Sequence, residues 1–273
     1  MKKDIKLISF DIDGTLINSK GELLAETKKL IEDLKKADYR MAFCTGRPFN
    51  AYWWIREELD LMGDDDLSIN STGAHIRKNS TGKALVNKVL AKADYEYLKS
   101  ILDDDRVQIY VQTRDIMYTN YDKPNKAFLF DQKLVRMPRL KFDDFDQIDH
   151  MISKICFAGE PSVLDEFDQR HKSTLEEKYK YMRNATNVIE ILKKGAGKSE
   201  GMKDLVDILG ISLDNVMYFG DGNNDVNTIK SVGVGVAMGN AREACKDVAD
   251  FVIGNNNDPS IANFVRKYLN LDE

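Results

Sequence analysis

Two acidic residues one position apart, Asp11 and Asp13, are the residues of this chain best suited to chemistry. They lie in an Asp-Ile-Asp-Gly-Thr segment directly after the apolar run Ile5–Phe10, which is typical of a strand inside a sheet. Gly14 allows a sharp turn there. Neighbouring carboxylates repel each other, so such a pair usually holds a metal ion or divides the roles of nucleophile and acid. The alternative is an Asp-Gly turn that only closes a strand.

A second polar segment, Thr45-Gly46-Arg47, follows the predicted strand Arg40–Cys44. Thr45 offers a hydroxyl, Gly46 an unshielded backbone N–H and Arg47 a positive charge, and these groups suit the oxygens of a phosphate. Taken alone, however, a Thr-Gly pair is equally typical of a helix cap or a turn.

A lysine, Lys198, stands after a Gly-Ala-Gly segment at the start of a predicted helix. There its ammonium joins backbone N–H groups that already favour an anion. The segment also suggests a P-loop, but that motif requires a glycine where this chain has Leu192, a residue of the preceding strand. We therefore reject the P-loop, and a solvated lysine at a helix start remains the alternative.

The segment Gly-Asp-Gly-Asn-Asn-Asp at 220–225 follows another predicted strand. Its spacing resembles an EF-hand loop, but Val226 and Val232 stand where that loop needs a glycine and a bidentate glutamate. The other interpretation is a strand-end loop that presents Asp221 to a magnesium ion, with Asn224 and Asp225 close by.

The remaining sequence predicts the scaffold for these loops. Strands and helices alternate in residues 1–82 and again in 188–273, which indicates a doubly wound α/β fold with a mainly parallel sheet. The rhythm changes over 83–187, and we predict an inserted α+β domain there. Since open α/β sheets collect ligands at the carboxyl ends of their strands, the polar segments are expected to meet.

Composition limits the partners. The 273 residues are 42% hydrophobic and 31% charged with a net charge of −5, which is ordinary for a globular protein and argues against a general nucleic-acid surface. Cys44, Cys156 and Cys245 lack metal-site or disulfide spacing, so we expect buried thiols in a reducing compartment. No segment is apolar enough to span a bilayer, and we expect a cytoplasmic protein without membrane contact. The oligomeric state is not indicated.

Taken together and in this order, the four motifs resemble those of the haloacid dehalogenase superfamily. The insertion between the second and third motifs, the Gly-x-Gly-Lys segment at 195–198 and the Gly-Val-Gly-Val-Ala-Met-Gly-Asn-Ala segment at 233–241 are similar to subfamily IIB, the Cof-type hydrolases and sugar phosphatases. The inserted domain then corresponds to a cap domain of the C2 type.

The resemblance implies a phosphatase that uses magnesium (Mg2+). Asp11 matches the nucleophile that forms an aspartyl-phosphate, and Asp13 matches the general acid and base. The implied metal ligands are Asp11, Asp13 through its carbonyl, Asp221 and, close by or through water, Asp225. The implied phosphate-binding residues are Thr45, Gly46, Asn224 and Lys198, the last also catalytic, with Arg47 as a substrate-binding candidate.

Two positions depart from the family pattern. Thr72 stands where an Asn-Gly-Ala segment usually has its asparagine, which bears on specificity. Thr228 stands where a methionine is common, which bears on packing. Neither belongs to the implied catalytic set.

We predict that the protein hydrolyses small phosphomonoesters, sugar phosphates first. One alternative is phosphoryl transfer to a second acceptor, as in a mutase, and another is a phospho-ligand-binding protein without activity. A phospho-signalling receiver also pairs aspartates with threonine and lysine, but receivers are far shorter and carry the acceptor aspartate on a later strand.

Overall fold

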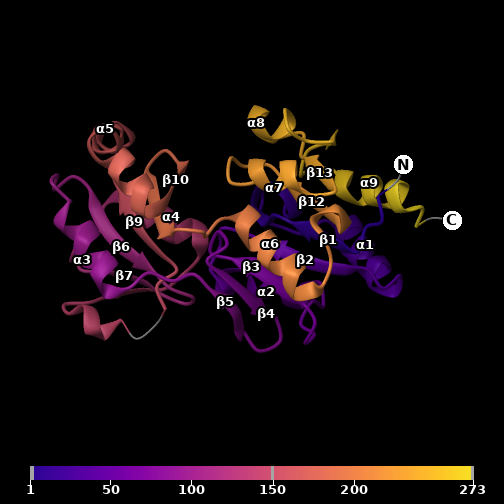
Figure 1. The fold of residues 1–273 in the computed structure, drawn as a ribbon, viewed down its shortest axis with the longest axis horizontal. Coiled ribbons are helices and arrows are strands. Elements are labelled where there is room, and N and C mark those ends of the chain that lie inside the picture. Colours follow the sequence, from indigo (N-terminus) through magenta and orange to yellow (C-terminus); the bar gives the residue numbers. More distant parts are fainter. Residues whose placement is uncertain (1–2, 149–150, 272–273) are drawn as a thin grey trace. The chain divides into compact units, whose positions relative to one another are not determined.

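The computed structural model describes residues 3–148 and 151–271, and the chain divides into two compact units (Figure 1). The first comprises residues 1–46, 53–86 and 197–273, and the second 47–52 and 87–196. The outermost residues of the predicted core domain, 1–2 and 272–273, lie outside the described residues.

The first unit contains an eight-stranded sheet in the order β14-β13-β12-β1-β2-β3-β4-β5. Its strands are β1 (Leu7–Phe10), β2 (Arg40–Cys44), β3 (Leu67–Asn70), β4 (His75–Lys78), β5 (Ala84–Asn87), β12 (Val216–Gly220), β13 (Val234–Ala237) and β14 (Phe251–Val252). The run from β14 to β3 is parallel, and β4 pairs antiparallel with β3. All four residues of β1 are buried, so both faces of the sheet are covered.

The order of the strands reverses at β1. The chain leaves β1 for β2 and β3 on one side, and later returns to β12, β13 and β14 on the other. Such a reversal opens a crevice at the carboxyl ends of the strands that flank it. The residues that follow β1 and β12 are Asp11 and Asp221.

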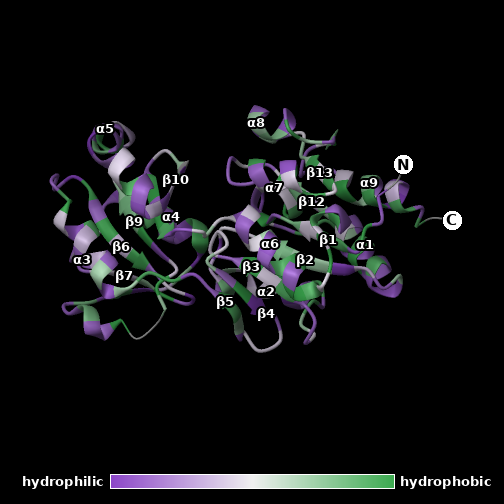
Figure 2. Cartoon of the chain, viewed as in Figure 1, coloured by the Kyte–Doolittle hydropathy of each residue, from purple (hydrophilic) through white to green (hydrophobic). Residues whose placement is uncertain are grey.

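The helices of the first unit are α1 (Ala25–Lys36), α2 (Trp53–Glu58), α6 (Lys198–Leu209), α7 (Val226–Ser231), α8 (Glu243–Lys246) and α9 (Ser260–Leu269). Helix α1 contacts α9, and α6 contacts α7. Figure 2 shows hydrophobic and hydrophilic residues in turn along α6 and α9, as expected for helices that bury one face. Helix α6 ends at Gly210, whose φ of +65° favours glycine.

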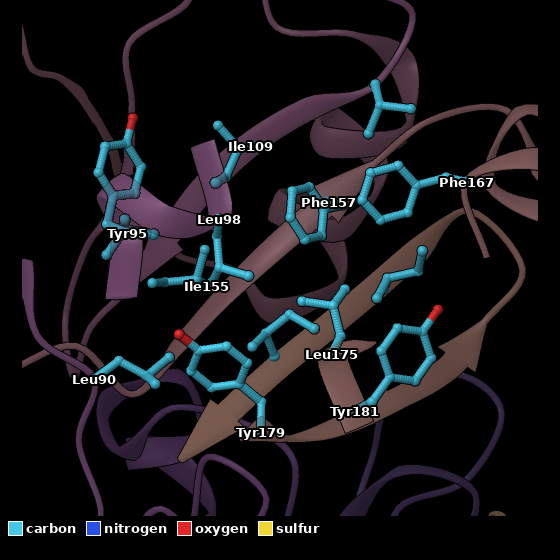
Figure 3. Packing of buried hydrophobic residues seen from close by; sticks show 14 of the residues in the cluster. Leu90, Tyr95, Leu98, Ile109, Ile155, Phe157, Phe167, Leu175, Tyr179 and Tyr181 are labelled. Carbon is cyan, nitrogen blue, oxygen red and sulfur yellow. The ribbon is translucent and has the colours of Figure 1, made fainter. Parts of the chain in front are cut away.

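The second unit contains a six-stranded sheet in the order β10-β11-β9-β6-β7-β8. Its strands are β6 (Gln108–Gln112), β7 (Met117–Thr119), β8 (Arg139–Lys141), β9 (Lys154–Ala158), β10 (Tyr179–Ala185) and β11 (Val188–Lys193), and its helices are α3 (Lys92–Ser100), α4 (Lys126–Val135) and α5 (Pro161–Lys178). A hydrophobic core joins α3 and α5 to the sheet. In it, Phe157 of β9 lies beside Phe167 of α5 with ring centroids 4.8 Å apart (Figure 3).

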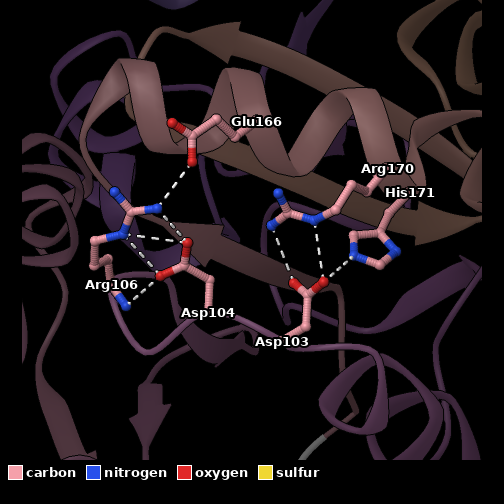
Figure 4. Close-up of polar contacts among 6 residues, drawn as sticks. All are labelled: Asp103, Asp104, Arg106, Glu166, Arg170 and His171. Atoms are coloured by element: carbon pink, nitrogen blue, oxygen red, sulfur yellow. Dashed lines mark hydrogen bonds and ion pairs between the residues drawn. The ribbon is translucent and has the colours of Figure 1, made fainter.

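Charged residues tie the loop after α3 to helix α5 (Figure 4). Arg106 donates to Asp104 at 2.6 Å and to Glu166 of α5 at 2.8 Å. Asp103 accepts two hydrogen bonds from Arg170 and lies 3.3 Å from His171. These pairs are largely exposed, so each contributes little to the free energy of folding. They hold the acidic loop after α3 against α5.

The structure confirms the predicted fold class, an α/β core with a mainly parallel sheet and a second, α+β unit with its own sheet. It differs at one boundary, because we expected 188–192 to be a core strand. Instead β11 pairs with β9 and β10 and so belongs to the second sheet. The three cysteines are free and buried, as expected. Within residues 3–148 and 151–271, no helix has the length and apolar character needed to cross a membrane.

Candidate active site

The turn after β1 brings Asp11 and Asp221 together. Asp11 continues the ladder between β1 and β12, since its N–H donates to the Phe219 carbonyl at 2.9 Å. Gly14 has a φ of +73°, and a Cβ there would lie 2.4 Å from Asp221 Oδ2. The turn therefore requires glycine for its backbone conformation and for space. Thr15 Oγ1 donates to Asp221 Oδ1 at 3.1 Å, which fixes that carboxylate.

Lys198 is the first residue of α6, and its side chain is fully buried. Its ammonium donates to Asp11 Oδ1 at 2.6 Å and to Asp225 Oδ1 at 2.7 Å. A buried lysine is stable only with such partners. The structure thus joins the third motif to the first and fourth through one side chain.

A close backbone contact places the start of α6. Gly73, in the turn between β3 and β4, has a φ of +80°, and a Cβ there would lie 2.0 Å from the Gly197 carbonyl oxygen. A Cβ at Gly201 would lie 2.8 Å from Ile69 Cγ2, so α6 also packs tightly on β3. These glycines allow Lys198 to enter the site from the first turn of the helix.

The carboxylates of Asp11, Asp221 and Asp225 form a group that could hold a metal ion. Each contributes an oxygen that lies within 4.8 Å of the others. Oxygen ligands of this kind suit magnesium. Three carboxylates against the single ammonium of Lys198 leave two negative charges unbalanced, which one divalent cation would neutralise. The donor set and its charge therefore fit Mg2+.

Burial and charge shift the pKa values in this group. Burial raises the pKa of Asp11 well above its usual range, Lys198 opposes this, and Asp225, Asp221 and Asp13 raise it further. Burial and the charge of Asp225 raise the pKa of Asp221 to about 6. Burial would lower the pKa of Lys198, but the carboxylates of Asp11 and Asp225 outweigh it and raise that pKa. The ammonium is therefore charged, and the site holds more negative charge than it can compensate.

The second motif lies at the end of β2. Thr45 is fully buried, its N–H donates to the Ile69 carbonyl at 2.9 Å, and its carbonyl accepts from the Thr72 N–H at 3.0 Å. Gly46 is adjacent, since a Cβ there would lie 3.5 Å from Thr72 Oγ1. Thr72, the departure from the family pattern, has a φ of +57°, a strained conformation for a β-branched residue. These bonds fix the loop after β2 to the loop after β3.

The other predicted residues are placed as follows. Asp13 is exposed at the mouth of the turn and raises the pKa values of Asp11 and Asp221. Asn224 is half-buried in the loop after β12. Arg47 is buried, groups with the second unit and donates to the Ala51 carbonyl at 3.3 Å. The structure therefore brings Asp11, Lys198, Asp221 and Asp225 together directly, whereas Arg47 donates to a carbonyl of the second unit.

Two residues that support the site were missed. Tyr218 of β12 donates from its hydroxyl to Asp225 Oδ1 at 2.5 Å. Asn240, which follows β13, donates to the Gly14 carbonyl at 2.8 Å. Asn240 lies in the segment 233–241 that resembles subfamily IIB, so the sequence marked the segment but did not indicate the contact with Gly14. For Tyr218 the only signal was a polar hydroxyl in an otherwise apolar buried strand.

The chain is similar to known proteins over nearly its whole length. The sequence profile of the haloacid dehalogenase-like hydrolases matches residues 8–265. The chain is 28% identical to the 5-amino-6-(5-phospho-D-ribitylamino)uracil phosphatase YcsE of Bacillus subtilis, over 97% of this chain and 96% of that protein. It is also 28% identical to the HMP-PP phosphatase of Citrobacter koseri, with the same coverage of both chains.

A solved structure shares the fold. The crystal structure of a haloacid dehalogenase-like hydrolase from Bacteroides thetaiotaomicron aligns with a TM-score of 0.86 and 24% identity, over 96% of this chain and 99% of that one. The family profile spans both ends of the chain, where the four motifs lie. The chain therefore belongs to the haloacid dehalogenase-like hydrolases, of the Cof type, and is a phosphatase.

Proposed function

We propose that the protein hydrolyses small phosphomonoesters in a magnesium-dependent reaction that passes through a phosphorylated Asp11. The observation that carries the proposal is the contact of Lys198 with both Asp11 and Asp225, beside Asp221. It supports one centre in which a nucleophile, a cation and a carboxylate metal site meet. Nucleophilic catalysis by a carboxylate divides a slow hydrolysis into two faster steps.

In the first step, a carboxylate oxygen of Asp11 forms a bond to phosphorus while the bond between phosphorus and the leaving alcohol oxygen breaks. Asp13 gives its proton to that oxygen, and the alcohol departs. In the second step, water attacks phosphorus, Asp13 takes the proton of the water, and the Asp11 carboxylate leaves. Inorganic phosphate is released and both aspartates return to their starting states. The exposed position of Asp13 is consistent with access to a leaving group and to water.

The residues proposed to hold magnesium are Asp11 and Asp221 through their carboxylates and Asp13 through its carbonyl. When bound, the ion supplies positive charge for the phosphoryl oxygens. The hydroxyl of Thr45, the N–H of Gly46, Lys198 and Asn224 are proposed to donate to the same oxygens. Two of the three N–H donors of Lys198 reach Asp11 and Asp225, and the third is proposed for the phosphoryl group. Such preorganised donors stabilise the transition state of phosphoryl transfer.

We propose sugar phosphates and similar small metabolites as substrates, with Arg47 as a contact. The two relatives named above have equal identity to this chain, yet their names specify different substrates. Sequence identity at this level therefore supports small phosphorylated metabolites as the class of substrate, but it does not identify the particular metabolite. Phosphate release measured across a panel of phosphorylated metabolites would rank them. Release of phosphate and alcohol in equal amounts, without an acceptor, would count against a mutase and against a non-catalytic binder.

Removal of the metal tests the proposal directly. After treatment with a chelator and desalting, phosphate release from p-nitrophenyl phosphate is expected to fall by about 100-fold or more, because the charge of the phosphoryl oxygens is no longer neutralised. Addition of magnesium should restore the rate. Full activity in the presence of excess chelator would refute the metal role of Asp221.

The pKa of Asp221 predicts how magnesium affinity depends on pH. Metal binding requires the carboxylate, and the raised pKa of about 6 means that protons compete with the ion below that pH. The half-saturating concentration of magnesium is expected to rise by about tenfold or more for each pH unit below 6. Activity titrated with magnesium at several pH values checks this. A half-saturating concentration that is the same on both sides of 6 would contradict the assignment.

A further inference from the structure

The carboxylate of Asp225 is surrounded by hydrogen-bond donors. Its Oδ1 accepts from Lys198 Nζ at 2.7 Å and from the Tyr218 hydroxyl at 2.5 Å. Its Oδ2 accepts from the N–H groups of Asp221 at 3.1 Å and of Gly222 at 2.9 Å. Asp225 itself is fully buried. A carboxylate offers about four lone-pair sites, so these four donors occupy them all.

This pattern separates Asp225 from the other two members of the acidic group. A direct metal ligand must present a lone pair to the ion, and Asp225 has each of its own directed at a donor. Its donors are parts of the proposed reaction centre, namely the lysine and the backbone of the loop that carries Asp221. The contacts therefore suit a residue that holds other groups in place.

Tyr218 is the donor that comes from outside the motifs. It lies within β12, where its neighbours in register are Ser9 of β1 and Gly235 of β13. These small residues leave room for a large ring on the sheet, and the ring is fully buried. Its hydroxyl is thus held by a rigid strand in the centre of the fold. A hydrogen bond from such a group restricts Asp225 more than a mobile donor would.

We propose that Tyr218 is a positioning residue for the reaction, acting through Asp225. Its hydroxyl fixes the Asp225 carboxylate, which in turn orients the Lys198 ammonium and the Asp221-Gly222 backbone. Tyr218 thereby fixes the positions of the Lys198 ammonium, which binds the phosphoryl group, and of Asp221, which binds the metal. It contacts neither substrate nor metal itself. The inference rests on the proposed function, and it assigns Asp225 to positioning rather than to direct metal ligation.

Replacement of Tyr218 by phenylalanine tests the inference. Tyr218→Phe removes one oxygen, keeps the ring, and leaves Oδ1 of Asp225 with Lys198 as its remaining side-chain donor. We expect kcat for p-nitrophenyl phosphate to fall by about tenfold, as for the loss of one hydrogen bond to a charged group. Magnesium affinity, measured by calorimetry on metal-free protein, should weaken several-fold. A purely structural role would lower the unfolding temperature and change neither quantity.

Tyr110 provides a matched control. It is also fully buried, and its hydroxyl donates to the Asp131 carboxylate at 2.5 Å, but it lies in the second unit. Tyr110→Phe should lower the unfolding temperature by a similar amount while kcat and magnesium affinity stay normal. All values are to be taken at a temperature at which circular dichroism shows every variant folded. An equal loss of kcat and of magnesium affinity in Tyr110→Phe would overturn the inference.

A double-mutant cycle identifies the route of the effect. If Tyr218 acts through Asp225, Tyr218→Phe should weaken magnesium affinity much less in an Asp225→Asn background than in the wild type. Additive losses would overturn the inference, as would wild-type kcat and affinity in Tyr218→Phe. The calorimetry also separates this inference from the proposed function. If the wild-type protein binds no magnesium, the proposed function fails. If the wild type binds magnesium but Tyr218→Phe and Tyr110→Phe have the same magnesium affinity and kcat, the positioning role fails.

Discussion

Asp11→Asn is expected to lower phosphate release by about 10⁴-fold or more, because an amide is a poor nucleophile toward phosphorus. The side chain at this position is buried, and its Oδ1 accepts from Lys198. Asparagine has nearly the same volume and can keep an oxygen toward the ammonium, so the fold should be retained. Release of phosphate from p-nitrophenyl phosphate, together with the unfolding temperature, measures both expectations.

A second aspartate serves as the control for this substitution. Asp168 pairs with Arg183 at 2.8 Å within the second unit. Asp168→Asn removes a charge of the same kind from an ion pair, and turnover should stay close to the wild-type rate. Normal turnover by Asp11→Asn would remove the nucleophile assignment, and with it the phosphorylated intermediate.

The meeting of distant motifs could be predicted from the sequence because it follows from strand order. Three site residues directly follow parallel strands, namely Asp11 after β1, Thr45 after β2 and Asp221 after β12. The carboxyl ends of parallel strands lie at one edge of a sheet. Short apolar runs bounded by glycine and aspartate were sufficient to identify those strands. The position of Lys198 at the start of α6 could also be predicted, because glycines precede it in the sequence.

The role of Asp225 could not be read from spacing. The sequence shows two aspartates four positions apart, and both interpretations of the loop treat the second as a candidate ligand. Whether its oxygens face a metal or the N–H groups of Asp221 and Gly222 depends on the turn that the loop adopts. Tyr218 adds a donor from the strand below, and a buried tyrosine in a strand is usually explained by packing alone.

The boundary of the second unit was missed for a related reason. Strand β11 carries the apolar pattern Val-Ile-Glu-Ile, which fits a strand of either sheet. Strand β11 pairs with β9, which is distant in the sequence, and the local sequence of a strand does not indicate which strand it pairs with. Similarly, Arg47 is the last residue of the second motif but groups with the second unit.

Lys198→Met is expected to affect activity and stability together. The substitution keeps a long unbranched side chain and removes the cation shared by Asp11 and Asp225. Loss of the charge that faces the phosphoryl group should lower kcat by about 10³-fold. Loss of one member of a buried ionic cluster should lower the free energy of unfolding of the metal-free protein by about 3 to 5 kcal/mol near neutral pH.

The stability loss in Lys198→Met should depend on pH with a definite sign. Burial already raises the pKa of Asp11, and without the ammonium that opposes this shift the pKa rises further. The folded variant then binds more protons than the unfolded chain, so its free energy of unfolding falls as pH rises through the folded pKa. The difference from wild type should therefore be largest at neutral pH and small in mild acid. Urea unfolding with excess chelator at both pH values measures it.

Magnesium and a second lysine complete the test of Lys198→Met. Because the ion carries the charge that the variant lacks, added magnesium should recover part of the stability through binding to the folded state. Lys203 lies on the same helix but is exposed, so Lys203→Met should leave the rate, the stability and its pH dependence close to wild type. A Lys198→Met protein as stable as wild type at neutral pH would show that Asp11 and Asp225 do not depend on this ammonium, and the proposed centre would then lose the contact that unites it.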